Sequence, residues 1–167
     1  MSELCSLREL GIEFIDGDRG SNYPKSNEFT DDGECLFLGA HNITESGFSF
    51  ERTQFISAEK DAILRKGKIQ RGDIVLMTRG TWGAGGAVGN VALYDDKVPF
   101  DNIRINSVML IIRCGDNYSP ELLYYLFRSS LIRNQIDNIV TGSVQNQLTA
   151  AVVSQLKVPR NPKVSVK

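Results

Sequence analysis

The sequence predicts an α+β domain in which strands come first along the chain and helices follow. Short apolar, β-prone runs, separated by turns rich in glycine and aspartate, occupy most of the chain up to Arg113. Ser119-Pro120-Glu121 is then a strong helix start, because it combines an N-cap, a proline at the first position and an early acid. The length of 167 residues suits one core, so we expect residues 1–167 to form a single domain.

The early strands alternate with turn-rich loops. We expect a strand at Ile12–Ile15, followed by the loop Asp16–Lys25, which is rich in glycine, Asx residues and proline. Cys35–Leu38 has the composition of a buried strand. Ser57 is the expected N-cap of a short helix, Ala58–Arg65.

The most informative stretch is a strand that ends in a glycine-rich tip. Asp73–Arg79 is apolar and β-prone, and Val91–Tyr94 resumes an apolar run. Gly80–Asn90 lies between them and contains five glycines in eleven residues. The pattern predicts strand, flexible tip, strand, which is a suitable setting for recognition chemistry.

The rest of the chain supplies a central strand and helices. Ile103–Arg113 is almost unbroken apolar sequence, which predicts one central strand despite the polar Asn106 and Ser107. Pro120–Ile139 has apolar residues at helical spacing and is expected to be a core helix, with Arg128 and Arg133 on its polar face. Leu148–Leu156 is the expected shorter helix that follows.

Composition and charge bound the class of protein. The chain is 41% hydrophobic and 23% charged, and it has neither a membrane-length apolar run nor a leader pattern, so we expect a cytoplasmic protein that does not contact membranes. Three widely spaced cysteines fit buried free thiols.

The net charge is −1, distributed as −7 over residues 1–50, +3 over 51–80 and +3 over 81–167. This distribution fits either scattered solvated charge or a mildly basic surface.

Catalytic and cofactor motifs are missing from the sequence. His41 is the single histidine, and no HExxH, CxxC or GxSxG pattern accompanies it. Gly83 and Gly85 fit a dinucleotide fingerprint, but Val88 stands at the third glycine and a strand rather than a helix follows. We therefore expect a non-catalytic protein without a metal or cofactor of its own.

What remains is a group of hydrogen-bonding residues in loops and at strand ends. Arginine pairs with guanine and asparagine with adenine in the major groove, while lysine holds phosphates and tryptophan stacks on bases. The candidate DNA-contacting residues are Arg19, Asn22, Tyr23, Lys25, His41, Asn42, Thr78, Arg79, Thr81, Trp82, Arg104 and Asn106.

Several of these candidates also have a structural interpretation. Asn22–Tyr23 fits the closing of a turn, and His41–Asn42 fits local capping at a strand end. Arg104, inside an apolar run, fits an edge position or a buried ion pair. Trp82 fits the core as well as it fits stacking.

Taken together, the motifs resemble the target recognition domain of type I restriction–modification specificity (S) subunits. The resemblance rests on the order and spacing of its pieces, since no single piece is specific. They are Gly17–Lys25, Leu36–Thr44, Leu64–Thr81, Gly89–Ala92, Val98–Phe100, Ile103–Ser107, Pro120–Ser130, Thr141–Leu148 and Leu156–Pro159. The resemblance implies an α+β domain built on a twisted, mixed or antiparallel sheet with flanking helices.

The resemblance also implies a function. Such a domain recognises one half of a bipartite double-stranded DNA target and is not catalytic. The specificity subunit directs a methyltransferase (modification) subunit and a restriction subunit, and S-adenosylmethionine, ATP and Mg²⁺ are expected only on those partners. The alternative is a protein-docking module with little DNA binding of its own, suggested by the apolar Leu148–Leu156 stretch.

The chain departs from the family pattern in two ways. Family members carry two recognition domains separated by spacer helices, and neither a spacer helix nor a second domain is present here. An excised domain, a truncated product and a half-subunit that works with a second copy all fit this departure. In addition, Trp82–Val88 is inserted between the Arg-Gly-Thr and Gly-Asn-x-Ala motifs.

Overall fold

The computed structural model of the protein describes residues 3–83, 85–141 and 147–160. Parts of two sequence motifs lie outside these residues: Ala84 in the glycine-rich tip and Gly142–Asn146 in the Thr141–Leu148 motif. The strands are β1 (Leu4–Ser6), β2 (Glu13–Asp16), β3 (Cys35–Phe37), β4 (Ile43–Thr44), β5 (Gly47–Phe48), β6 (Phe55–Ile56), β7 (Ile74–Met77), β8 (Val91–Leu93), β9 (Ile103–Arg104), β10 (Met109–Arg113) and β11 (Lys157–Pro159). The helices are α1 (Ala58–Ile63), α2 (Pro120–Arg128), α3 (Ser130–Thr141) and α4 (Ala150–Ser154), with short 3₁₀ turns at Ser26–Glu28 and Ala40–Asn42.

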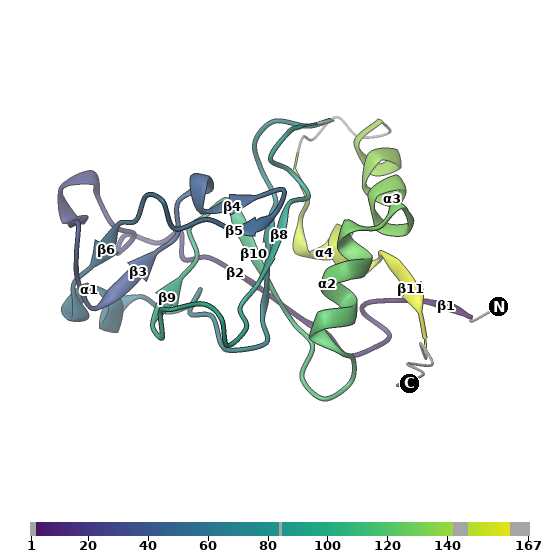
Figure 1. The fold of residues 1–167 in the computed structure, drawn as a ribbon, viewed down its shortest axis with the longest axis horizontal. Coiled ribbons are helices and arrows are strands. Elements are labelled where there is room, and N and C mark those ends of the chain that lie inside the picture. The colour runs from purple at the N-terminus through teal and green to yellow at the C-terminus, as the bar shows by residue number, and fades with distance from the viewer. Residues whose placement is uncertain (1–2, 84, 142–146, 161–167) are drawn as a thin grey trace.

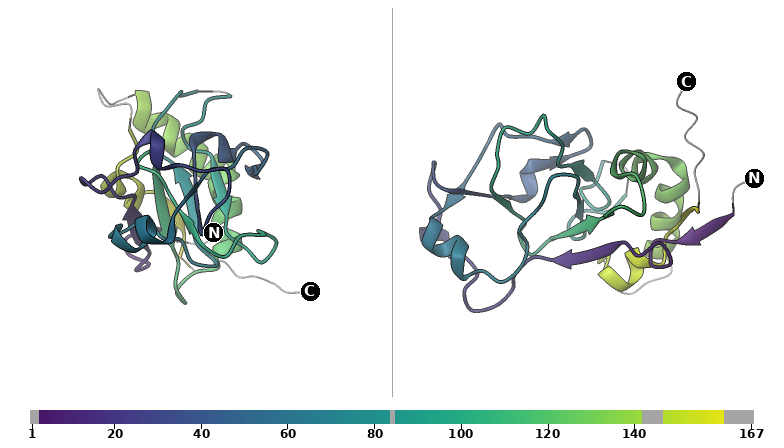
Figure 2. Two further views of the ribbon diagram at one scale, coloured as in Figure 1. Left: turned by 90° about the vertical axis from the view of Figure 1, so that its left-hand side faces the viewer. Right: turned by 90° about the horizontal axis from the view of Figure 1, so that it is seen from below.

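The strands form several small sheets, and most of the helical structure gathers at one end of the molecule (Figure 1). A four-stranded antiparallel sheet in the order β2-β10-β7-β8 occupies the middle. A three-stranded sheet in the order β6-β3-β9 lies on one side of it with α1, while α2, α3 and α4 lie on the other (Figures 1 and 2). Because β3 and β9 run parallel while the other paired strands run antiparallel, the α+β class with mixed pairing is confirmed.

The core sits on both faces of the middle sheet because β10 is buried on both sides. Successive side chains of a strand point to opposite faces. Leu110 and Ile112 pack in a cluster with Leu123 and Phe127 of α2. Met109 and Ile111 belong to a second cluster, which reaches the three-stranded sheet. Each fully buried aliphatic side chain of this kind contributes roughly 1.5–3 kcal/mol of transfer free energy.

The strand–tip–strand prediction is confirmed. Strands β7 and β8 pair antiparallel, with Ile74 opposite Leu93 and Leu76 opposite Val91. The pairing extends into the tip, where the Gly89 N–H donates to the Met77 carbonyl at 2.9 Å. The described part of the tip is closed by the Val88 N–H, which donates to the Thr81 carbonyl at 3.0 Å.

The prediction of a single central strand over Ile103–Arg113 was wrong. The segment forms β9 and β10, which belong to different sheets. The chain turns between them because Asn106 Oδ1 accepts a hydrogen bond from the Val108 N–H at 2.9 Å, which is an Asx turn. The polar residues inside the apolar run therefore mark a turn.

The expected core helix is two helices instead of one. Ser129 has extended backbone angles, φ −83° and ψ 163°, and caps the end of α2. Its Oγ donates to the Leu126 carbonyl at 2.6 Å, and its own carbonyl accepts from the Arg133 N–H in the first turn of α3. A serine that satisfies the end of one helix and the start of the next redirects the chain without proline or glycine.

The other local predictions agree with the structure. Ser57 Oγ accepts from the Lys60 N–H at 3.1 Å and caps α1, and Thr149 caps α4 in the same way at 3.2 Å. The three cysteines are free and buried, as expected. No helix within the described ranges is long and apolar enough to cross a membrane.

Candidate nucleic-acid interface

Three loops meet beside the middle sheet. The loop that starts at Gly17 contacts the link after β9 so closely that a side chain at Gly17 would overlap the Asn106 carbonyl oxygen. The Asp18 carboxylate accepts from the Arg65 N–H at 2.9 Å, which joins the same loop to the segment after α1. Arg19 Nη2 donates to the Ser107 carbonyl at 3.2 Å. The start of the sequence-predicted loop is therefore held by two other segments, the link after β9 and the segment after α1.

Beside these contacts, the loop and the segment after α1 form a basic, open cavity of ≈ 340 Å³, lined by Asp18, Arg19, Gly20, Ser21, Asn22, Arg65 and Lys66. Hydrogen bonds from the backbone N–H groups of Arg65 and Gly20 lower the pKa of Asp18. The charged carboxylate of Asp18 is therefore engaged in bonds within the protein. The three cations of the lining outnumber its one carboxylate. A cavity of this charge suits an anionic ligand such as a phosphate backbone.

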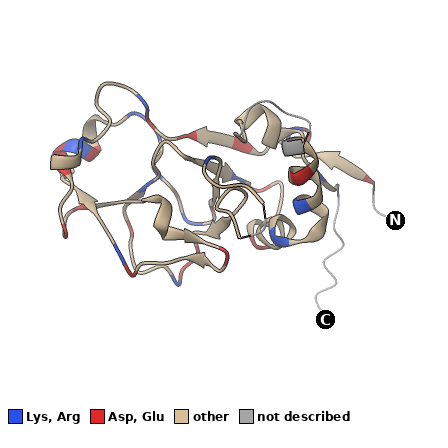
Figure 3. Cartoon of the chain, turned by 90° about the horizontal axis from the view of Figure 1, so that it is seen from above, with Lys and Arg blue, Asp and Glu red and all other residues tan. Residues whose placement is uncertain are grey.

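Arg65 and Lys66 were missed as candidates by the sequence analysis. They follow Leu64, the C-cap of α1, and the expected helix Ala58–Arg65 included Arg65, since a basic residue in a last turn suits the helix dipole. The positive balance of residues 51–80 was the available signal. Over the whole chain, basic and acidic residues are interspersed instead of covering one face with one sign (Figure 3).

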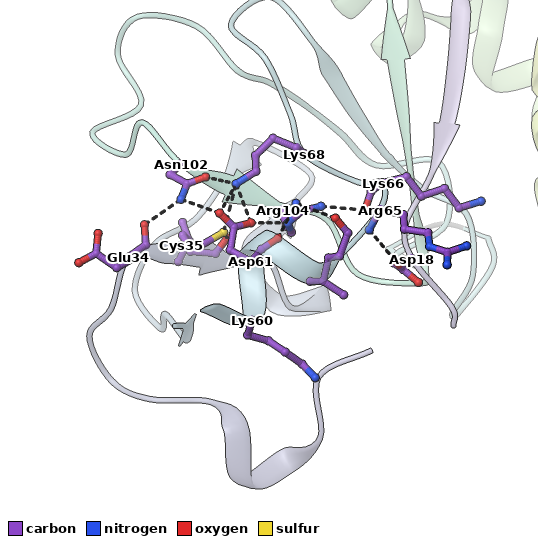
Figure 4. A network of polar contacts seen from close by, with 12 residues as sticks. Asp18, Glu34, Cys35, Lys60, Asp61, Arg65, Lys66, Lys68, Asn102 and Arg104 are labelled. Atoms are coloured by element: carbon purple, nitrogen blue, oxygen red, sulfur yellow. Dashed lines mark hydrogen bonds and ion pairs between the residues drawn. The ribbon is translucent and has the colours of Figure 1, made fainter. Parts of the chain in front are cut away.

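The segment after α1 that carries Arg65 and Lys66, here called the basic loop, is held in place by an ion-pair network centred on Asp61 (Figure 4). The guanidinium of Arg104 is bonded to the Asp61 carboxylate and donates to the carbonyl oxygens of Lys66, at 3.0 Å, and Leu64, at 3.2 Å. Lys68 Nζ lies 2.6 Å from Asp61 Oδ2. The network fixes the backbone on both sides of Arg65, so it positions the cavity wall.

The protonation states of this network follow from its contacts. Burial opposes ionisation of Asp61, but hydrogen bonds from Lys68, Arg104 and Asn102 outweigh it and lower the pKa of Asp61 to about 2. Burial raises the pKa of the neighbouring Cys35 thiol to about 12. At neutral pH the network therefore contains two cations, one carboxylate and a neutral thiol.

Arg104 itself does not face solvent. Its residue is 6% exposed and its guanidinium is committed to Asp61 and the surrounding carbonyl groups. Of the two structural alternatives, the buried ion pair is the one that the structure shows. Arg104 therefore supports the candidate interface from inside the protein, and we do not count it among the residues expected to contact DNA.

Asn42 is also used internally. It has no exposed surface, its Nδ2 donates to the Ser49 and Arg52 carbonyls at 2.8 Å each, and its Oδ1 accepts from the Gly39 N–H at 2.9 Å. His41 is exposed, with Nε2 3.1 Å from the Arg52 carbonyl. The amide of Asn42 therefore provides the local capping at this strand end, and we do not count Asn42 among the residues expected to contact DNA.

Tyr23 is a supporting residue of the loop, whereas Lys25 is exposed to solvent. The ring of Tyr23 packs edge-on against Phe37, with centroids 5.7 Å apart, and anchors the loop to β3. Lys25 is exposed, and its backbone N–H donates to Glu28 Oε2 at 2.7 Å. Asn22 is exposed and lines the cavity.

The end of β7 adjoins the same link after β9. Thr78 is 3% exposed, and its N–H and Oγ1 both donate to the Val108 carbonyl, at 3.0 and 3.1 Å. Thr78 is therefore a support for the half-buried Arg79, whose Nε is buried without a hydrogen-bond partner. In the tip, Thr81 is exposed, whereas Trp82 is half-buried and packs against the core.

The structure thus brings Arg19 and Asn22 to one cavity, with the Asn106–Val108 turn beside Arg19. Thr78, the residue before Arg79, is bonded to the same turn. Solved structures of similar fold are available for comparison. An S subunit of a type I restriction–modification system from M. genitalium superposes with a TM-score of 0.58, at 14% identity over 93% of this chain. The HsdS subunit from Thermoanaerobacter tengcongensis gives 0.59, at 18% identity over 94% of this chain.

The chain has the fold of type I S subunits. A third structure, from work on complex assembly and conformational transition of the type I R-M system, gives a TM-score of 0.60 at 18% identity over 93% of this chain. The described fold accounts for 32–33% of the length of these three solved chains. No protein-family model and no curated protein matches the sequence.

Proposed function

We propose that the chain is a sequence-specific DNA-recognition domain that reads one half of a bipartite target for a type I restriction–modification complex. The observation that carries this proposal is the basic cavity of ≈ 340 Å³ at the meeting point of three loops, in a chain with the S-subunit fold. Arg65, Lys66 and Lys25 are exposed cations suited to phosphates.

In this proposal the bases are recognised by arginine, asparagine and threonine side chains at the cavity and at the glycine-rich tip. Arg19 and Asn22 line the cavity, and Arg79 and Thr81 stand at the mouth of the glycine-rich tip. Arginine and asparagine pair bidentately with guanine and adenine, each pair giving roughly 1–3 kcal/mol of discrimination. Their contact with DNA stays a prediction.

Catalysis in the proposed complex belongs to other subunits. A methyltransferase subunit would bind S-adenosylmethionine, and a restriction subunit would use ATP and Mg²⁺. The domain would direct both by holding the target. The other half of the target would be read by a second recognition domain or a second copy. The S-subunit fold supports this assignment.

The deciding experiment selects duplexes from a random pool with the chain in complex with its methyltransferase partner. We expect one enriched half-site, and a pool without enrichment contradicts the proposal. Arg65→Ala with Lys66→Ala should weaken binding to every sequence, because phosphate contacts carry no sequence information. The matched control is Arg8→Ala, since Arg8 is exposed near β1 and outside the cavity.

Salt dependence provides a second measurement. Log affinity should fall linearly with log salt, with a slope of roughly −0.9 per neutralised phosphate, and the double variant should have a slope shallower by about 2. An unchanged slope in the double variant shows that the cavity does not hold the backbone.

The alternative of a docking module rested on the apolar Leu148–Leu156 stretch. Leu148, Val153 and Leu156 are buried in the core. The apolar character of this stretch is thus explained by packing inside the domain. If the Arg65/Lys66 double variant loses its methyltransferase partner while retaining DNA, docking is favoured instead.

A further inference from the structure

A second cavity lies where the sheet meets the elbow between α2 and α3. Its volume is ≈ 170 Å³. It is lined by Glu45 from the β4–β5 turn, by Gly89 and Asn90 before β8 and Val91 at its start, and by Phe127, Arg128 and Arg133 from the two helices. None of these residues takes part in the cavity between the three loops, so this is a separate place on the surface.

Asn90 is a buried polar residue that faces this cavity with an unused group. It is 7% exposed, and its Oδ1 is buried without a hydrogen-bond partner. Its backbone is fully engaged, since the N–H donates to Ala87 and the carbonyl accepts from Met77. A buried polar group without a hydrogen-bond partner is unfavourable. The NH₂ group of the same amide is a hydrogen-bond donor.

Arg133 is placed against the backbone at the same wall. Gly89 has φ +91°, and a side chain there would collide with Nη1 of Arg133. The backbone conformation at Gly89 admits another residue only with strain, and a side chain there would displace the guanidinium of Arg133. None of the ion pairs found in the described ranges includes Arg133 or Arg128.

The local charge favours a singly charged anion. Arg128 donates to the Tyr124 hydroxyl at 3.1 Å and keeps its charge within the lining. The two arginines and Glu45 sum to one positive charge. Guanidinium forks match the oxygens of phosphate, and the Asn90 amide supplies a further donor.

The cavity lies close to the predicted reading strand. Met77 is hydrogen-bonded across the ladder to Asn90, with a donor–acceptor distance of 2.9 Å. Arg79 is two residues beyond Met77, so the glycine-rich tip runs from Arg79 and returns to this cavity. A duplex held at Arg79 would therefore bring its backbone to the same end of the sheet.

We propose that Arg133, Arg128 and Asn90 bind one phosphodiester group of the DNA backbone. This inference rests on the proposed function and adds to it a phosphate contact contributed by the helical end of the domain. The glycine-rich tip then lies between two anchored points, with the Arg79–Thr81 segment on one side and the phosphate on the other.

The test measures affinity against salt for the chain with its methyltransferase partner, using the selected duplex. Arg133→Ala should lower affinity roughly tenfold and reduce the salt slope by about 1, with the same sequence selected. Arg133→Lys should keep the slope. Asn90→Asp, equal in size but negatively charged, should weaken binding further. Arg8→Ala is the control for loss of a surface charge, and thermal unfolding verifies that each variant is folded.

The outcomes separate this inference from the proposed function. If the unmodified chain selects no sequence, both are overturned. If it selects a sequence and Arg133→Ala keeps the original slope, only the phosphate site is overturned. If Arg133→Ala keeps DNA affinity but loses the methyltransferase subunit, the cavity takes a carboxylate of that partner, and the phosphate assignment is likewise overturned.

Discussion

Replacing Asp61 by asparagine tests the network behind the basic loop. The substitution keeps the side-chain shape and removes the charge that faces Arg104, whose side chain is 8% exposed, and Lys68, at 2.6 Å. Breaking a buried pair costs roughly 3–5 kcal/mol. Arg104 keeps its bonds to carbonyl oxygens, and Lys68 is partly exposed, so we expect a loss of about 2–4 kcal/mol in the free energy of unfolding at pH 7.

The dependence on pH is the sharper part of the prediction. The folded-state pKa of Asp61 is about 2, below its ordinary value of 3.8, so its stabilisation is complete above about pH 4 and declines as pH falls toward 2. The difference between Asp61→Asn and the original protein should narrow by about 1 kcal/mol at pH 3.

Urea denaturation from pH 7 to pH 3 measures both quantities. Asp101→Asn is the matched control, because Asp101 pairs with Arg71 at 2.7 Å but its side chain is 97% exposed. An exposed pair contributes less than about 1 kcal/mol. A difference between Asp61→Asn and the original protein that stays constant down to pH 3, or that does not exceed the Asp101→Asn control, refutes the reasoning.

Three further predictions concern the fold around the interface. Arg113→Leu leaves the carboxylate of Asp73, which is 2% exposed, without the partner that now holds it at 2.8 Å, so chemical denaturation should show a loss of roughly 3–5 kcal/mol; a loss below 1 kcal/mol argues against a buried pair. Gly17→Ala places a methyl group on the Asn106 carbonyl and should reduce both thermal stability and DNA affinity; unchanged values for both would show that the loops do not depend on this contact. Because burial raises the pKa of Cys35 to about 12, iodoacetamide at pH 8 should modify it only after unfolding, and mass spectrometry showing labelling of the folded protein contradicts this.

The sequence identified the features that depend on neighbouring residues. Ser57 caps α1, Ser119 and Pro120 begin α2, and the glycine-rich tip joins two paired strands. Each follows from local preferences: a serine oxygen facing a free N–H, a proline ring that fits a first turn, and glycines that permit positive φ.

The errors occurred where a distant partner or a single polar residue decided the structure. Ile103–Arg113 is divided because β9 pairs with β3 from far upstream, and the Asn106 side chain makes the turn. The helical spacing across Ser129 is nearly continuous, so the break there depends on one serine that serves both helices.

The sequence indicated where the candidate residues lie along the chain, but not which of them are exposed and which are buried supports. The sequence pointed to polar residues in loops, and Arg19 and Asn22 do meet at one cavity. It had no means of showing that Arg104 faces Asp61, because these residues approach only through α1 and β9. Arg65 and Lys66 were missed because the same basic residues satisfy a helix end and a binding surface equally well.

The pairing of β1 with β11 brings the first and last described strands of the chain together. Leu4 lies opposite Pro159, and the Arg160 N–H donates to the Glu3 carbonyl at 2.9 Å. The chain therefore enters and leaves the folded body at the same point. Joining these two strands by a short linker while opening an exposed loop should therefore preserve the fold, and thermal unfolding of the permuted protein measures this.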